Sequence, residues 1–127
     1  MDIHKAIAAA EKILPGQVAP DGETDERWQA IILIEEHIEK YPDEVWNFAA
    51  KWGCHNDEDL RTAIGVLLLE RLLEHHFAAI FPRLEAAVRT DKNFAHSFMC
   101  AWKLGHALEP KNAARFDSLR AEIRDRN

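Results

Sequence analysis

Residues 57–76 read DEDLRTAIGVLLLERLLEHH, and this stretch decides the fold. Its apolar residues recur at intervals of three and four, which places them along one face of an amphipathic helix. These residues are Leu60, Ile64, Leu67, Leu68 and Leu72. A helix so rich in leucine is stable in water only when other helices cover it. The stretch therefore predicts an all-α protein.

The bulk properties of the chain point to one helical domain covering residues 1–127. A chain of 127 residues with 47% hydrophobic and 30% charged residues is ordinary for a single globular domain. We expect no membrane span and no secretory signal, because no apolar run is long enough and the N-terminal segment carries Asp2 and Glu11. A cytoplasmic location follows as an expectation, with Cys54 and Cys100 reduced.

Capping residues and prolines predict six to seven helices. The first covers residues 2–14 and stops at Pro15. The second begins after Thr24 as its N-cap and runs to Tyr41. Pro42 opens the third, and Gly53 ends it in a left-handed conformation.

The second half of the chain is divided by similar signals. Asn56 or Asp57 caps the long fourth helix, which we expect to break near Phe81-Pro82, because a proline ring clashes with the preceding helical turn. A short helix then covers residues 83–90, and another covers residues 92–104, ended by Gly105. Asn112 caps a last helix over residues 113–124.

A weak similarity between two segments of the chain suggests how the helices are arranged. Residues 45–53, VWNFAAKWG, align with residues 97–105, SFMCAWKLG, with three identities and an aromatic pair, Trp46 and Phe98. This predicts two stacked helical hairpins, as in helical solenoids. The alternative explanation is chance similarity between two amphipathic helices.

Charge is distributed unevenly, and this asymmetry carries the functional prediction. Residues 21–59 hold twelve acidic and three basic side chains, a net charge of −9, whereas residues 60–127 carry +3. An acidic segment of this kind favours binding of a basic protein partner, with no catalysis. The predicted partner-binding residues are Glu35, Glu36, Glu39, Asp43, Glu44, Trp46 and Trp52.

Nucleic-acid binding and enzymatic catalysis find little support. The C-terminal arginines alternate with acids, as on a solvated helix, and the isoelectric point is near 5.6; these arginines are Arg115, Arg120, Arg124 and Arg126. The chain has no glycine-rich phosphate loop, nucleophile elbow or His-Glu-x-x-His run. We therefore expect neither an enzyme nor a cofactor.

The alternative is a small zinc-binding enzyme or sensor. His96 and Cys100 are one helical turn apart, and His55 follows the third helix, so stacked hairpins would bring them together, with Glu74 as a further ligand. The plainer interpretation makes Cys100 a core residue and His96 partly exposed. A second group, Glu70, Glu74, His75 and His76, lacks the second helix that metal-carboxylate bundles need, so a solvated face explains it better.

Two segments resemble a group of small bacterial helical domains of unknown function. They are LLLERLLEHHFAAIFPRLE at residues 67–85 and FAHSFMCAWKLG at residues 94–105, within a resemblance that covers residues 45–105. The resemblance implies HEAT-like hairpins and, for members found beside toxin genes, a role as immunity proteins. Glu70 and His76 are the polar members of the pattern. We thus expect, most concretely, an immunity protein that blocks a basic toxin such as a nuclease.

Overall fold

The computed structural model describes residues 1–126 and is built of helices joined by short connections. In chain order these are α1 (Ile3–Ile13), α2 (Glu26–Glu35), α3 (Pro42–Trp52), α4 (Glu58–Ala63), η1 (Ile64–Leu69), α5 (Glu70–Thr90), α6 (Lys92–Met99), η2 (Gly105–Leu108) and α7 (Pro110–Arg126). Segment η1 is π-helical and joins α4 to α5 without interruption, whereas η2 is a short 3₁₀ helix. Since the described residues contain no strand, the all-α prediction is confirmed.

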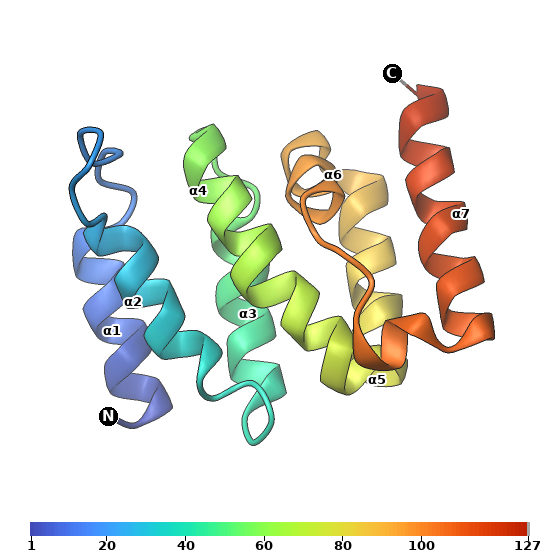
Figure 1. The fold of residues 1–127 in the computed structure, drawn as a ribbon, viewed down its shortest axis with the longest axis horizontal. Coiled ribbons are helices and arrows are strands. Elements are labelled where there is room, and N and C mark those ends of the chain that lie inside the picture. The colour runs from blue at the N-terminus through green and yellow to red at the C-terminus, as the bar shows by residue number, and fades with distance from the viewer. Residues whose placement is uncertain (127) are drawn as a thin grey trace.

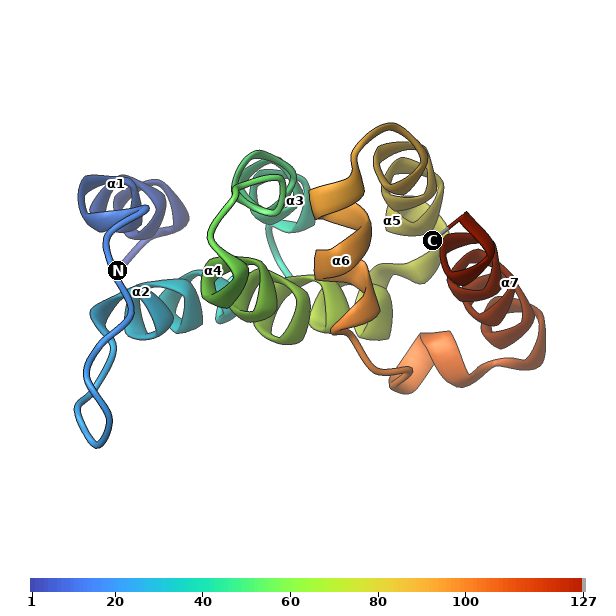
Figure 2. The same ribbon diagram turned by 90° about the horizontal axis from the view of Figure 1, so that it is seen from above.

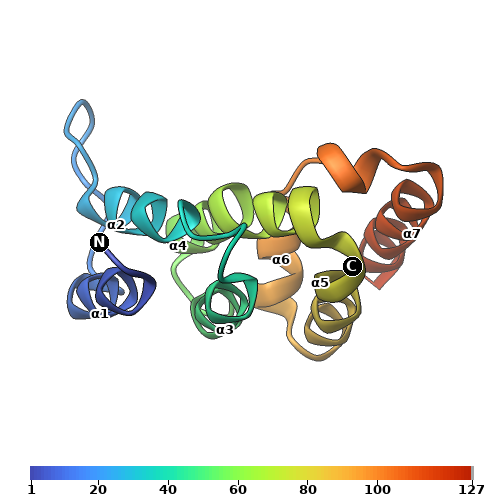
Figure 3. The same cartoon turned by 90° about the horizontal axis from the view of Figure 1, so that it is seen from below.

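The helices lie in two layers along the long axis of the molecule. Helices α1, α3 and the second half of α5 form one layer, and α2 with the continuous run of α4, η1 and the first half of α5 forms the other (Figure 2, Figure 3). Helix α7 covers the end of the molecule opposite α1 (Figure 1). Successive helices thus pair across the layers, as expected for stacked hairpins.

The leucine-rich stretch is the centre of the core, as its spacing predicts. Leu60, Ile64, Leu68 and Leu72 are each at most 1% exposed. The η1 segment contacts α2, α3 and α6, so one continuous helix touches most of the other elements. None of the helices in residues 1–126 is long and apolar enough to cross a membrane.

Gly65 allows α6 to lie directly against η1. A Cβ at this position would be 2.0 Å from the backbone oxygen of Ser97 and 2.9 Å from the Cβ of Cys100. Only a residue without a side chain permits so close an approach. Ser97 in turn donates a hydrogen bond of 2.8 Å from its hydroxyl to the Gly53 carbonyl, which fixes α6 against the end of α3.

Several helix ends differ from the predictions. Asp25, not Thr24, is the N-cap of α2, and its carboxylate accepts the backbone N–H of Arg27. Helix α2 ends at Glu35 instead of Tyr41, because residues 36–40 form a tight turn. The start of α3 at Pro42 and the capping of α4 by Asp57 are confirmed.

Gly53 ends α3, although it does not adopt the predicted left-handed conformation. Its φ is −66°, in the right-handed helical region. A Cβ here would lie 2.9 Å from the ring of Phe94, so the position requires a small residue for close packing.

The break in the long helix lies at His76, six residues before the predicted break at Pro82. His76 has φ −138° and ψ 41°, and its Nε2 lies 3.0 Å from the carbonyl oxygen of Ile38 in the α2–α3 turn. Helix α5 continues through Pro82, which is exposed, and runs to Thr90. The separate helix predicted for residues 83–90 is therefore the second half of α5.

The last two predicted helices are also shifted. Helix α6 ends at Met99, and residues 101–104 are not helical, so the aligned segments 45–53 and 97–105 are not a structural repeat. Gly105 begins η2 instead of ending α6. Helix α7 starts at Pro110, and Asn112 lies inside it, donating a side-chain hydrogen bond of 2.9 Å to the His106 carbonyl.

Candidate partner-binding site

The acidic segment is divided between the two ends of the helical layers. The starts of α2 and α4 lie at one end, and the turn between α2 and α3 lies at the other (Figure 1). The first end carries Asp21, Glu23, Asp25, Glu26, Asp57, Glu58 and Asp59. The second carries Glu35, Glu36, Glu39, Asp43 and Glu44. A single acidic face over the whole segment is thus not formed.

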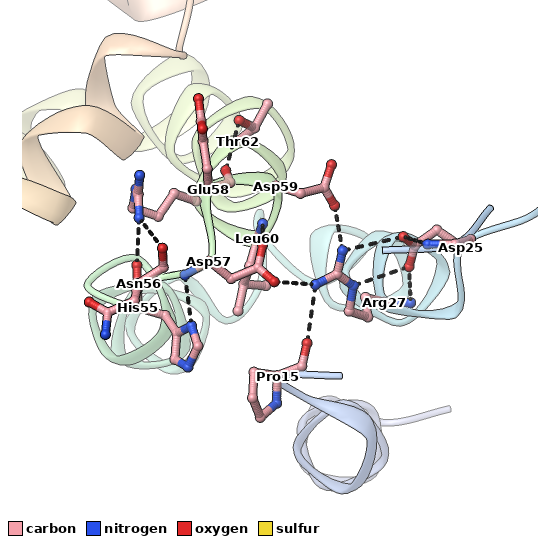
Figure 4. Close-up of polar contacts among 12 residues, drawn as sticks. Pro15, Asp25, Arg27, His55, Asn56, Asp57, Glu58, Asp59, Leu60 and Thr62 are labelled. Carbon is pink, nitrogen blue, oxygen red and sulfur yellow. Dashed lines mark hydrogen bonds and ion pairs between the residues drawn. The ribbon is translucent and has the colours of Figure 1, made fainter. Parts of the chain in front are cut away.

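At the first end, three carboxylates surround one buried arginine. Arg27 is 3% exposed, and its guanidinium lies 3.3 Å from Asp25, 3.0 Å from Asp57 and 2.6 Å from Asp59 (Figure 4). It also donates a hydrogen bond of 3.2 Å to the carbonyl of Pro15. We call these residues the Arg27 cluster. It joins the connection after α1 to the starts of α2 and α4.

The carboxylates of the Arg27 cluster are fully engaged within the molecule. Burial alone would raise the pKa of Asp25, but the backbone N–H of Ala19 and the guanidinium and N–H of Arg27 outweigh it, so this pKa lies below its usual value. The pKa of Asp57 is lowered in the same way, against burial, by the Leu60 N–H and by Arg27. These acids stabilise the fold and offer little charge to a partner.

At the second end, predicted site residues line a surface cavity of about 220 Å³. The cavity lies between the α2–α3 turn and α5, and it is lined by Glu35, Glu36, Ile38, Glu39, Arg71 and His75. We call it the acidic pocket. It brings together three of the predicted residues, namely Glu35, Glu36 and Glu39.

Acidic groups outnumber the cations around this pocket. Arg71 lies 3.6 Å from Glu35 and 2.7 Å from Glu74, so one guanidinium serves two carboxylates. Burial raises the pKa of Glu35; Arg71 opposes this rise, and the carboxylates of Glu70, Glu36 and Glu74 add to it. The excess of negative charge follows from the lining itself, in which three carboxylates face one arginine.

The outer wall of the pocket is open to solvent. The side chain of Glu39 is 80% exposed, and one of its carboxylate oxygens lies 3.6 Å from Nδ1 of His75. Glu36 is also exposed and forms no ion pair with a described residue. Among the described residues, neither side chain has an ion pair with an arginine or a lysine, and both are exposed.

The remaining predicted acids lie beside the acidic pocket, not in it. Asp43 forms an ion pair of 2.8 Å with Arg83 of α5. Glu44 lines a separate shallow hollow between α1 and α3, together with Glu11 and Lys51. They extend the acidic surface along the first turn of α3.

The two predicted tryptophans differ in their suitability as partner contacts. Trp46 is only 8% exposed and packs edge-on against Phe94 with ring centroids 5.7 Å apart, so it belongs to the core and its prediction as a surface anchor is wrong. Trp52 is half-buried. Its indole N–H lies 3.3 Å from Glu11, and the ammonium of Lys51 lies 5.2 Å from its ring.

The proposed metal ligands do not converge. The α3–α4 connection does approach α6, but Arg61 lies between them. Its guanidinium donates hydrogen bonds of 3.2 Å to His96 Nδ1 and of 3.0 Å to the His55 carbonyl. The sulfur of Cys100 is nearest to backbone and hydroxyl oxygens. Within residues 1–126 no group of three histidine, cysteine or carboxylate side chains is placed to hold a metal, so the zinc alternative, with Glu74 included, is not carried forward.

The two polar residues of the leucine-rich pattern both hold backbone in place. Glu70 is 7% exposed and accepts the backbone N–H of Trp102 at 2.8 Å. His76 contacts the Ile38 carbonyl. Each therefore fixes a connecting segment against the central helix.

Sequence reasoning missed the Arg27 cluster. A usable signal was present, because Arg27 is one of three basic residues among twelve acids in residues 21–59. A cation in so acidic a segment is expected to form ion pairs with several of the surrounding carboxylates. The spacing of its partners along the chain gave no hint of their contact.

Comparison with known proteins adds no assignment. No family model matches the chain, and neither a curated protein nor a solved structure matches it.

Proposed function

We propose that this protein binds a basic protein partner through the acidic pocket. The observation that carries the proposal is the exposed pair Glu36 and Glu39 at the rim of a cavity whose one arginine, Arg71, is already shared between Glu35 and Glu74. A lysine or arginine side chain of a partner would enter beside these two residues. Complementary charge of this kind raises the association rate and selects the partner.

The specific form of the proposal is an immunity protein. The partner would be a basic toxin, such as a nuclease, whose active-site surface is cationic. Support comes from the charge excess at the α2–α3 turn and from the family resemblance of residues 45–105. The function requires no catalytic group, in keeping with the prediction that the chain is not an enzyme.

Charge reversal tests the pocket directly. The variant Glu36→Lys/Glu39→Lys changes two exposed side chains, and we expect it to bind the partner at least about tenfold more weakly, with a flatter salt dependence. The control is Glu23→Lys/Glu58→Lys, which makes the same change in net charge at the opposite end, where both side chains are exposed.

The measurement begins with tagged wild-type and variant proteins used as bait in cell lysate at low salt. A basic protein retained by the wild type and the control, but not by the pocket variant, is then purified and titrated against all three by calorimetry. Equal affinity for all three proteins would contradict the proposal, and so would equal loss in both variants, because net charge alone would then explain binding.

A further inference from the structure

A second cavity lies at the other end of the molecule, between the end of α5, the start of α6 and the end of α7. Its volume is about 350 Å³, within the range of small-molecule sites. We call it the α6–α7 groove. The second half of α5 and α7 lie side by side (Figure 1, Figure 2). The Arg89 guanidinium joins them by donating two hydrogen bonds, of 3.0 and 3.1 Å, to the Glu122 carboxylate.

The floor of the groove is apolar. It is formed by Val88, Ala95, Met99 and Ile123, one or more from each of the three helices. Val88, Ala95 and Ile123 are between 1% and 6% exposed, so this floor is continuous with the core and held rigidly. A rigid apolar floor favours a ligand with an apolar body.

The rim of the groove is cationic. Lys92 and Arg124 are exposed and form no ion pair with a described residue, and Arg126 also lines the rim. Arg89 is neutralised by Glu122 and by Glu85, 3.5 Å away. The rim therefore carries positive charge that the groove itself does not compensate.

The other polar groups of the rim are occupied. Asp91, the one acidic residue in the lining, accepts the Phe94 N–H at 2.9 Å as the N-cap of α6. His96 accepts from Arg61. Asp91 is thus a single carboxylate against the three cations Lys92, Arg124 and Arg126 of the lining. In a protein with a net charge of −6, this is an unusual local excess of cations.

From this combination we infer that the α6–α7 groove binds a small organic anion with an apolar body. The anionic head would lie between Lys92 and Arg124, because a guanidinium and an ammonium bind a carboxylate with charge-assisted hydrogen bonds. The apolar body would cover Met99 and Ile123. This site is separate from the acidic pocket and does not depend on the proposed function.

Octanoate is a suitable probe, since it joins a carboxylate to an apolar chain. Titrated into isotopically labelled protein, it should shift the backbone amide signals of residues 88–99 and 123–126 and leave those of the α2–α3 turn unchanged. Octanol tests the need for charge, and butyrate tests the need for the apolar body. We expect both to bind at least about tenfold more weakly than octanoate.

Substitution locates the head group. Lys92→Ala/Arg124→Ala should lower octanoate affinity about tenfold, whereas Lys40→Ala/Lys111→Ala, which removes two exposed cations elsewhere, should leave it unchanged. Circular dichroism of both variants checks that they fold. Absence of shifts in the groove, equal binding of octanol and octanoate, or equal effects of the two variants would overturn the inference.

Discussion

Arg27 joins three segments that are distant in the sequence through its side-chain contacts. Its guanidinium links the connection after α1 to two helix starts, and Asp59 also accepts the indole N–H of Trp28 at 3.0 Å. A buried charge of this kind is tolerated because several carboxylates and a carbonyl satisfy it. Removal of the arginine alone would leave Asp25, Asp57 and Asp59 crowded together without a cation.

We predict that Arg27→Leu destabilises the protein at pH 7 by about 3 kcal/mol, because it strips the partner from a buried ionic group. Urea unfolding followed by circular dichroism measures this loss. The control is Arg83→Leu, which breaks the exposed ion pair with Asp43 and should cost about 1 kcal/mol or less. Similar losses in the two variants would show that burial of Arg27 adds nothing.

The same cluster predicts a pH dependence with a definite sign. The pKa values of Asp25 and Asp57 are lowered in the folded protein, so their contribution to stability is present above the unfolded-state pKa near 4 and is lost as pH falls through the lower folded-state values. The stability difference between wild type and Arg27→Leu should therefore be largest near neutrality and should shrink below about pH 4. Unfolding curves from pH 7 to pH 3 test this, and a constant difference would contradict it.

At the scale of helices, some starts encoded by neighbouring residues were predicted correctly, although Thr24 and Asn112 are not the caps predicted for them, and ends fixed by distant residues were not predicted. Pro42 and Asp57 act on the helices that directly follow them. The end of α6, in contrast, depends on Arg120 of α7, which donates to the carbonyls of Met99 and Ala101. No sequence pattern near Met99 predicts this contact with Arg120, about twenty residues further along the chain.

The break at His76 leads to a prediction for Pro82. Since α5 is helical on both sides of this exposed proline, Pro82→Ala should restore a missing backbone hydrogen bond and increase the free energy of unfolding by about 1 kcal/mol. Thermal unfolding measures the change. A destabilised variant would show that the proline, and not His76 with the Ile38 carbonyl, determines the course of the helix.

The contact between η1 and α6 gives a second prediction at this scale. Gly65→Ala places a methyl group against the Ser97 backbone and should cost about 3 kcal/mol. Gly22→Ala is the control, because a Cβ added at this position would have no atom within 4 Å. We expect it to lower the free energy of unfolding by about 1 kcal/mol, since its φ is +83°. Chemical denaturation separates the two, and equal costs would refute the packing argument.

At the scale of the whole molecule, the sequence predicted the helix class and the excess of charge but not how that charge is arranged. Residues 21–59 pass twice along the molecule, so acids that are near in sequence lie at opposite ends. Five of the twelve acidic residues lie at the α2–α3 end, and three others form ion pairs with Arg27. Net charge over a segment therefore supports the proposed basic partner but does not locate the pocket.

The layered arrangement also predicts where the fold is most resistant to opening. The continuous segment α4–η1–α5 contacts α2, α3 and α6, whereas α1 packs mainly on α2. Amide hydrogen exchange should be slowest in residues 64–73 and faster in α1 and α7. Protection of α1 equal to that of η1 would mean that the molecule opens only as one unit.

Trp102, in the non-helical connection after α6, is 72% exposed, whereas its backbone N–H is held by the carboxylate of Glu70. The other three indoles are buried or half-buried. The molecule consequently contains its own optical probe: collisional quenching by iodide should act mainly on Trp102 fluorescence and disappear largely in Trp102→Phe. What remains of the emission would then report on the packed interior.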